Sequence, residues 1–185
     1  MILPRPARLA ALAAAAALVG CPIPQPLPGY PATGLITPPR FLVSSVLPPD
    51  PVVEVGSACA ADPIFHLSAT LVDENTTEAI AYRWFLDCTA TANGCIPVLT
   101  SQIPPPLANA PTVLRDVDPY AFDAYGGLGH ADGAVHVVEL VVSNGFLTNT
   151  PDTTVDPLAW RKPALNYETQ LYRWVFHYSA AGACP

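Results

Sequence analysis

Prolines between residues 22 and 39 limit which part of this chain can fold. In the segment PIPQPLPGYPATGLITPP, proline stands at nearly every second position over the first half. Each proline fixes φ and removes a backbone N–H donor, so neither an α-helix nor a central β-strand can form there. Such a segment favours extended polyproline II, at about 3.1 Å per residue. We therefore expect a disordered tether over residues 21–39 and a folded domain over residues 40–185.

The residues before Cys21 have the features of an export signal. Arg5 and Arg8 give the chain a positively charged start, and residues 9–19 are an uninterrupted run of Leu, Ala and Val. This run is too short to span a bilayer as a helix, which needs about 20 residues. A charged start followed by a short apolar run is typical of a signal peptide, which we predict for residues 1–20.

The sequence Leu18-Val19-Gly20-Cys21 resembles the lipobox of bacterial lipoproteins. The resemblance implies that lipid is attached to Cys21, that the chain is cut just before it, and that Cys21 anchors the protein in a membrane. Several acyl chains would give stable anchoring, since each buried methylene contributes about 0.8 kcal/mol. Pro22 stands where some of these lipoproteins carry an inner-membrane retention Asp, which favours the outer membrane of the bacterial cell envelope. An ordinary signal peptide with an accidental cysteine is the alternative.

Four further cysteines, Cys59, Cys88, Cys95 and Cys184, follow the proposed anchor. An even number of cysteines in an oxidising compartment favours disulfides. Cys88 and Cys95 flank a short loop, so we predict that they close a hairpin and that Cys59 pairs with Cys184. A zinc site is the alternative, although no Cys-x-x-Cys or paired His spacing supports it.

The charge of the chain excludes some partners. The formal net charge is −7, and removal of Arg5 and Arg8 with the leader leaves 6 basic against 15 acidic side chains, or −9. Lys162 is the single lysine, so there is no basic patch. An acidic surface argues against binding to nucleic acid and against direct binding to anionic lipid headgroups.

Beyond Pro39 the chain consists of short apolar segments with a period of two, separated by turn signals. The predicted strands are residues 40–47, 52–55, 64–72, 80–87, 96–102, 112–117, 134–143 and 169–179. The first two are interpreted as one edge strand interrupted by Pro48–Pro51, and residues 118–133 and 148–166 as long loops. Since no segment has an amphipathic helical pattern, we predict an all-β antiparallel sandwich of about seven strands.

Several of these segments resemble bacterial immunoglobulin-like (Ig-like) and PKD-type domains. The residues that carry the resemblance are Val53, Val55 and Gly56, then Phe65-x-Leu67-x-Ala69 and Val72-Asp73, then Ile80-x-Tyr82-x-Trp84, and finally the valine-rich strand that ends in Ser143-Asn144-Gly145. The resemblance covers roughly residues 52–145, with residues 169–179 as the last strand. It implies an Ig-like domain used for adhesion, spacing or protein contact, without catalysis.

The titratable residues give no catalytic or metal-binding pattern. The histidines His66, His130, His136 and His177 lack the close His-x-His spacing of metal sites in β-sandwiches. The acidic segment with Asp116, Asp118, Asp123 and Asp132 lacks EF-hand spacing and is interpreted as a solvated loop. No Gly-x-Ser-x-Gly motif or phosphate-binding loop is present. We therefore predict no catalytic residue, no metal and no cofactor.

Two groups of aromatic residues are candidates for a contact surface. Trp160 lies beside Arg161 in one long loop, while Tyr120, Phe122 and Tyr125 lie in the other. One interpretation is that each group covers the edge of the core. The other is that each group is exposed for binding, since interface anchors are often Trp and Arg. We expect the loops to contact an unidentified envelope or extracellular protein or glycan. The alternative function is a carbohydrate-binding module or an extracytoplasmic hydrolase that uses these aromatics with the acidic residues.

Overall fold

The structure is a computed structural model that describes residues 37–91, 94–109, 112–147, 156–180 and 184. All of them belong to the unit formed by residues 34–185. The predicted signal peptide, Cys21 and all but the last three residues of the predicted tether lie outside the described residues. Within the described part, no helix is long and apolar enough to cross a membrane.

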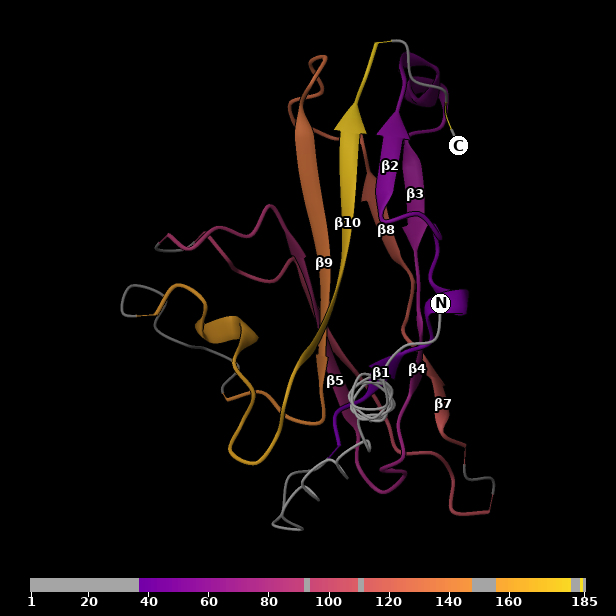
Figure 1. Cartoon of the computed structure of the whole chain (residues 1–185), viewed down its shortest axis with the longest axis vertical. Helices are drawn as coiled ribbons and strands as arrows, with labels where there is room; N and C mark the ends of the chain where they lie inside the picture. Colours follow the sequence, from indigo (N-terminus) through magenta and orange to yellow (C-terminus); the bar gives the residue numbers. More distant parts are fainter. Residues whose placement is uncertain (1–36, 92–93, 110–111, 148–155, 181–183, 185) are drawn as a thin grey trace, which may run out of the picture. The chain divides into compact units, whose positions relative to one another are not determined.

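Ten strands and three short 3-10 helices make up the described secondary structure (Figure 1). The strands are β1 (Arg40–Phe41), β2 (Val52–Val55), β3 (Ile64–Leu67), β4 (Thr70–Val72), β5 (Ile80–Leu86), β6 (Leu99–Ile103), β7 (Leu114–Asp116), β8 (Tyr120–Asp123), β9 (Val135–Ser143) and β10 (Gln170–Tyr178). The 3-10 helices are η1 (Val43–Ser45), η2 (Ser57–Ala61) and η3 (Ala159–Arg161).

These strands form the two layers of a β-sandwich (Figure 1). The first layer is a five-stranded sheet in the order β2-β10-β9-β5-β6. The second layer contains the sheets β1-β4-β7 and β3-β8. β3 and β4 follow each other along the chain, as do β7 and β8. Because β3 pairs with β8 and β4 pairs with β7, the two sheets are the two halves of one interrupted pair of strands. The predicted all-β sandwich is thus confirmed.

The chain changes layers between β1 and β2. β1 pairs antiparallel with β4, whereas β2 runs parallel to β10 at the edge of the five-stranded sheet. The crossing segment is Pro48–Pro51, whose prolines cannot donate to a sheet, and the Leu47–Pro48 peptide bond is cis. The predicted interrupted edge strand therefore forms two edge strands in different sheets.

Several predicted boundaries were wrong, among them that of the strand 40–47, which ends at Phe41 and is followed by η1. The predicted strand 64–72 is broken at Ser68-Ala69, where Ser68 instead bridges to Leu47. The predicted loop 118–133 begins with a strand, β8, because Tyr120 and Phe122 alternate with Ala121 and Asp123 and pair with β3. Four residues after an Asp-Pro turn are too short a run for this alternation to be recognised in the sequence.

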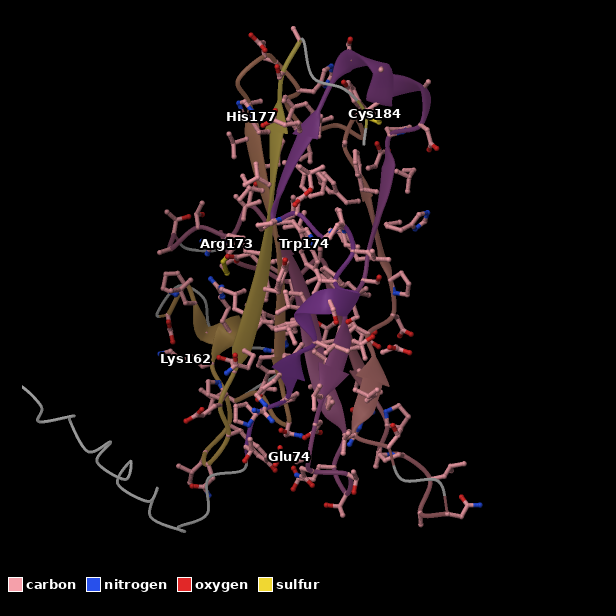
Figure 2. All side chains as sticks on the ribbon, turned by 45° about the vertical axis from the view of Figure 1, so that its right-hand side comes forward. Glu74, Lys162, Arg173, Trp174, His177 and Cys184 are labelled. Atoms are coloured by element: carbon pink, nitrogen blue, oxygen red, sulfur yellow. A yellow bond between two sulfur atoms is a disulfide. The ribbon has the colours of Figure 1, made fainter. Side chains whose placement is uncertain are left out.

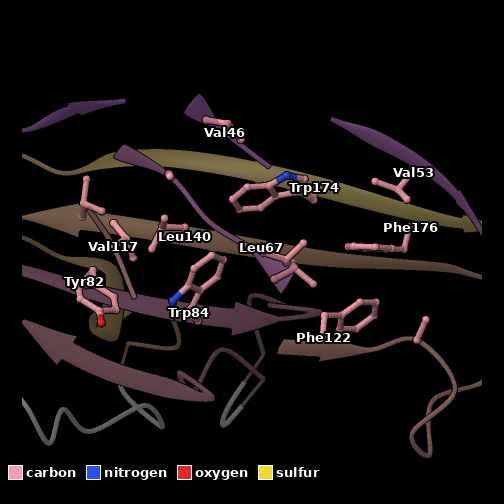
Figure 3. Close-up of a cluster of buried hydrophobic side chains, with 14 of the residues drawn as sticks. Val46, Val53, Leu67, Tyr82, Trp84, Val117, Phe122, Leu140, Trp174 and Phe176 are labelled. Atoms are coloured by element: carbon pink, nitrogen blue, oxygen red, sulfur yellow. The ribbon is translucent and has the colours of Figure 1, made fainter. Parts of the chain in front are cut away.

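The core between the layers is built around two stacked indoles (Figure 3). Trp84 of β5 lies 5.6 Å from Trp174 of β10 and 5.2 Å from Tyr120 of β8, measured between ring centroids. Both tryptophans are fully buried, and the Nε1–H group of Trp174 donates to the Pro48 carbonyl at 3.1 Å. Neither β3, β4 nor β9 carries a cysteine, so aromatic stacking occupies the centre where antibody domains have a disulfide.

Both disulfides join the cysteines that were predicted to pair. Cys88 is bonded to Cys95 in the loop after β5, and Cys59 is bonded to Cys184 across 125 residues. Cys59 lies in η2 and is fully buried. The second bond thereby fastens the end of the chain to the segment between β2 and β3.

We expect replacement of Trp174 by Ala to lower the free energy of unfolding by about 3–5 kcal/mol, because it removes a large buried ring and leaves a cavity. Urea denaturation followed by circular dichroism would measure the loss. The control is Val52→Ala in the neighbouring strand, where the side chain is 53% exposed and the change should stay within about 0.5 kcal/mol. Equal midpoints for the two variants would contradict the importance of the stack.

We expect the two disulfides to contribute unequally to stability. In the chain-entropy model, opening the Cys59–Cys184 loop by a double Ala substitution costs about 4–5 kcal/mol, and opening the short Cys88–Cys95 loop costs about 2 kcal/mol. Denaturation midpoints of the two double variants, compared in the same buffer, test this order. A larger loss for the Cys88–Cys95 pair would contradict it.

Candidate functional site

The outer face of the five-stranded sheet, which points away from the core, is partly covered. Here the side chains of Leu171, Val141 and Arg83 form one row across three strands, and those of Arg173, Glu139 and Phe85 form the next. Figure 2 shows Arg173 and Trp174 on opposite sides of β10. Residues 144–147 and 156–168, which we call the covering segment, lie over these rows, joined to each other by a Phe146–Pro163 bridge.

Glu139 is the buried charge at the centre of this face. Its side chain is only 3% exposed. The Nε–H group of Arg173 donates to Oε1 at 2.8 Å, and Nη2 of Arg161, from the covering segment, lies 3.2 Å from Oε2. A buried carboxylate is destabilising unless it is paired, so two guanidinium groups offset the cost of burying this one.

Arg83 is the second buried charge, 1% exposed, on the same face. Its guanidinium carbon lies 4.1 Å from the ring centre of Phe146 and 4.9 Å from that of Trp160, within the range of cation–π attraction. Its Nη1 group also donates a hydrogen bond to the Trp160 carbonyl. Burial lowers the pKa of Arg83 to about 10, which leaves it charged at neutral pH.

The covering segment and the Cys88–Cys95 loop meet over Phe85. Phe85, Cys95 and Val141 form a second buried apolar cluster, against which Cys88, Phe146 and Trp160 pack. The Nη1 group of Arg161 lies 3.6 Å from the sulfur of Cys88, and its guanidinium lies over the Phe85 ring. The outer face therefore holds a small core of its own with charged residues inside it.

The five predicted contact residues do not form one surface. Trp160 and Arg161 pack on the outer face of the five-stranded sheet, whereas Tyr120 and Phe122 pack on its inner face. Phe122 is 1% exposed, so its assignment to a contact surface was wrong, because the side chain fills the core between the layers. Tyr120 stacks on Trp84, and the hydroxyl of Tyr125 donates to the Gly56 carbonyl at 3.0 Å.

The acidic residues Asp116 and Asp118 are exposed, and neighbouring hydroxyl groups bind them separately. Asp116 accepts from the Thr70 hydroxyl at 2.6 Å, and Asp118 accepts from Tyr82 at 2.6 Å. Burial is the first cause that raises the pKa of Tyr82, followed by its bond to Asp118. Among the described residues, no three His, Cys, Asp or Glu side chains lie close enough together to hold a metal ion.

A buried ion pair fastens the loops at one end of the sandwich. Nη2 of Arg115 lies 3.3 Å from Oδ2 of Asp73, and both side chains are almost completely buried. Arg115 also donates to the backbone carbonyls of Asn75 and Glu78, and Asn144 donates to Asp73 at 3.2 Å. Asp73, which directly follows β4, and Asn144, which directly follows β9, thus meet at one point.

The burial of Arg83 and Glu139 on the outer face was not predicted from the sequence. The signal was present, because Phe85, Val137 and Val141 share that face and are apolar. A solvent-exposed sheet face would alternate to polar residues at these positions.

Comparison of the chain with protein-family models, with curated proteins and with solved structures finds no match.

We expect replacement of Glu139 by Ala to lower the free energy of unfolding by about 2–3 kcal/mol, because it leaves Arg161 and Arg173 without their carboxylate. The partial exposure of Arg173 to solvent keeps the loss from being larger. Limited proteolysis should then cut the covering segment faster than in the wild type. The matched control is Glu54→Ala, which removes an exposed carboxylate paired with His177 and should change stability by less than about 1 kcal/mol. Equal effects of the two substitutions would refute the role assigned to Glu139.

Proposed function

We propose that the chain is a bacterial cell-envelope lipoprotein, held in the outer membrane by lipid on Cys21, which presents an Ig-like domain for binding or structural work and not for catalysis. The observation that carries the proposal is the use of the cysteines. Four of them form two disulfides within the domain, as in proteins exported to an oxidising compartment. The fifth is Cys21, which ends the lipobox-like sequence.

The order of segments along the chain supports this arrangement. A short apolar leader is followed by Cys21, then by the proline-rich stretch, and β1 begins directly after Pro39. Residues 22–39 can reach roughly 55 Å when extended as polyproline II. In the proposed protein, this stretch separates the domain from the membrane surface.

The structure of the domain also favours binding or structural work. Ig-like sandwiches serve many cell-surface proteins as rigid modules with exposed loops. Trp160 and Arg161 are engaged with the sheet, so the proposed contact surface is reduced to the exposed parts of the loops, such as His130, Asp132 and Leu165. The partner is proposed to be an envelope or extracellular protein.

Glycan binding is the second candidate function, and one observation favours it. A hollow of about 240 Å³ is lined by Tyr125, His130 and Asp132, together with residues of η2 and the end of β10. An aromatic ring beside a carboxylate is suited to sugar recognition. Trp160 lies on the other side of the five-stranded sheet from the core and does not join this hollow.

We expect replacement of Cys21 by Ala to abolish lipid attachment. The wild-type chain should take up radiolabelled palmitate, accumulate as a precursor in globomycin, and sediment with membranes, whereas Cys21→Ala should remain unlabelled and soluble after cell disruption. A Cys88→Ala/Cys95→Ala variant serves as the control and should keep the label. Palmitate uptake by Cys21→Ala would contradict the proposed anchor.

The soluble Cys21→Ala chain also serves as bait for the binding partner. Capture of one envelope protein in stoichiometric amounts supports the binding module. Co-sedimentation with purified cell-wall glycan, lost when Tyr125 is replaced by Ala, supports the glycan-binding alternative instead.

A further inference from the structure

The loop between β8 and β9 is fixed at its two ends, where Asp132 also accepts a hydrogen bond from the Ala180 N–H group at 2.8 Å. We call residues 125–134 the glycine loop. Its ends are fixed by the Tyr125 hydroxyl bond to Gly56 and by the Gly133 N–H, which donates to the Tyr178 carbonyl at 2.8 Å. Between these points, Leu128 packs against the core, and the carbonyl of Gly129 lies 2.7 Å from the ring of His136.

His136 contacts two acceptors at the same time. Its Nδ1 atom lies 2.7 Å from Oδ2 of Asp87, and its Nε2 atom lies 2.7 Å from the Gly129 carbonyl oxygen. A carboxylate and a carbonyl can only accept hydrogen bonds, whereas a neutral imidazole carries a single N–H donor. Both contacts are satisfied together only when both ring nitrogens are protonated, so the observed geometry is that of the imidazolium form.

The groups around the His136 ring determine which of its two hydrogen bonds is lost when the ring is deprotonated. Asp87, at the end of β5, is held in place by the Val137 N–H, which donates to its Oδ1 atom at 2.8 Å. Tyr178 of β10 meets the ring edge-on at 5.5 Å, and burial raises its pKa to about 12, so it stays neutral. From the glycine loop, the Gly129 carbonyl contacts the ring. From β8, the charge of Asp123 helps to raise the pKa of Tyr178.

We propose that His136 is a proton-dependent latch for the glycine loop. When the imidazolium loses a proton to solvent, the charge-assisted bond keeps the remaining N–H on Nδ1, facing Asp87. Nε2 then presents a lone pair to the Gly129 carbonyl, and this attachment of the loop is lost. Because Tyr125, His130 and Asp132 line the 240 Å³ hollow, opening of the latch changes the wall of that hollow.

The titration of His136 gives the direction of the effect. Burial lowers the pKa of His136, but its bonds to Gly129 and to the Asp87 carboxylate outweigh burial and raise the pKa above 6.5. A group whose pKa is raised by folding stabilises the fold below its unfolded pKa, and this stabilisation is lost as the pH rises through the folded value. The latch is therefore closed in mildly acidic solution and opens as the pH rises.

Nuclear magnetic resonance of the full chain tests the latch. We expect both ring nitrogens of His136 to be protonated at pH 6, and the Gly129 carbonyl carbon shift to follow the same titration. Above the midpoint, amide exchange of residues 127–130, corrected for intrinsic rates, should rise by about fivefold, the factor that corresponds to one hydrogen bond of ordinary net strength. A Gly129 shift and loop exchange that stay constant through the His136 titration overturn the proposal.

Three variants separate the latch from other causes. In His136→Gln the loop should exchange at a rate that no longer depends on protonation, while Asp87→Asn should lower the titration midpoint. His177→Gln removes an exposed histidine that contacts Glu54, and it should keep the wild-type profile. An unchanged pH response in a folded His136→Gln variant assigns the transition to another group. If that variant does not fold, the wild-type Gly129 shift still decides.

Discussion

The pairing of Glu139 with Arg161 and Arg173 determines what the outer face of this sandwich can be. In a two-layer sandwich, the outer face of each sheet ordinarily meets water and carries alternating polar residues. Here the carboxylate draws Arg161, and with it the covering segment, onto the sheet. Phe146 and Trp160 then enclose Arg83, and residues 82–85 of β5 and 138–143 of β9 are buried on both faces. One buried charge thus determines the placement of a loop that has little regular structure of its own.

The parts of the fold that depend on local alternation could be predicted from the sequence. The long strands β5, β9 and β10 were predicted to within a residue or so, because period-two patterning is a local property. The break of β3 from β4 could not, since it follows from the bridge between Ser68 and Leu47, far apart in the sequence. The cysteine pairing was accessible because only three pairings exist, and a short loop favoured one of them.

The candidate site was harder to predict than the fold. An aromatic residue in a loop looks the same in sequence whether it binds a partner or packs inward, and Phe122 and Trp160 both pack against the sheet. The role of His136 depends on Asp87, which directly follows β5, and on Gly129 of the glycine loop. Such contacts are tertiary, and no spacing along the chain encodes them.

The bond between Cys59 and Cys184 has a mechanical consequence. A chain stretched between its N-terminal end and its C-terminus transmits the load through this bond, because residues 59–184 form a closed covalent loop. Only the segment ahead of Cys59, with β1 and β2, lies in the path of the force. β2 pairs in parallel with β10, so the hydrogen bonds between these two strands resist the separation of β2 from the sheet. The covalent path of the load therefore bypasses the central strands β5 and β9 while the disulfide is intact.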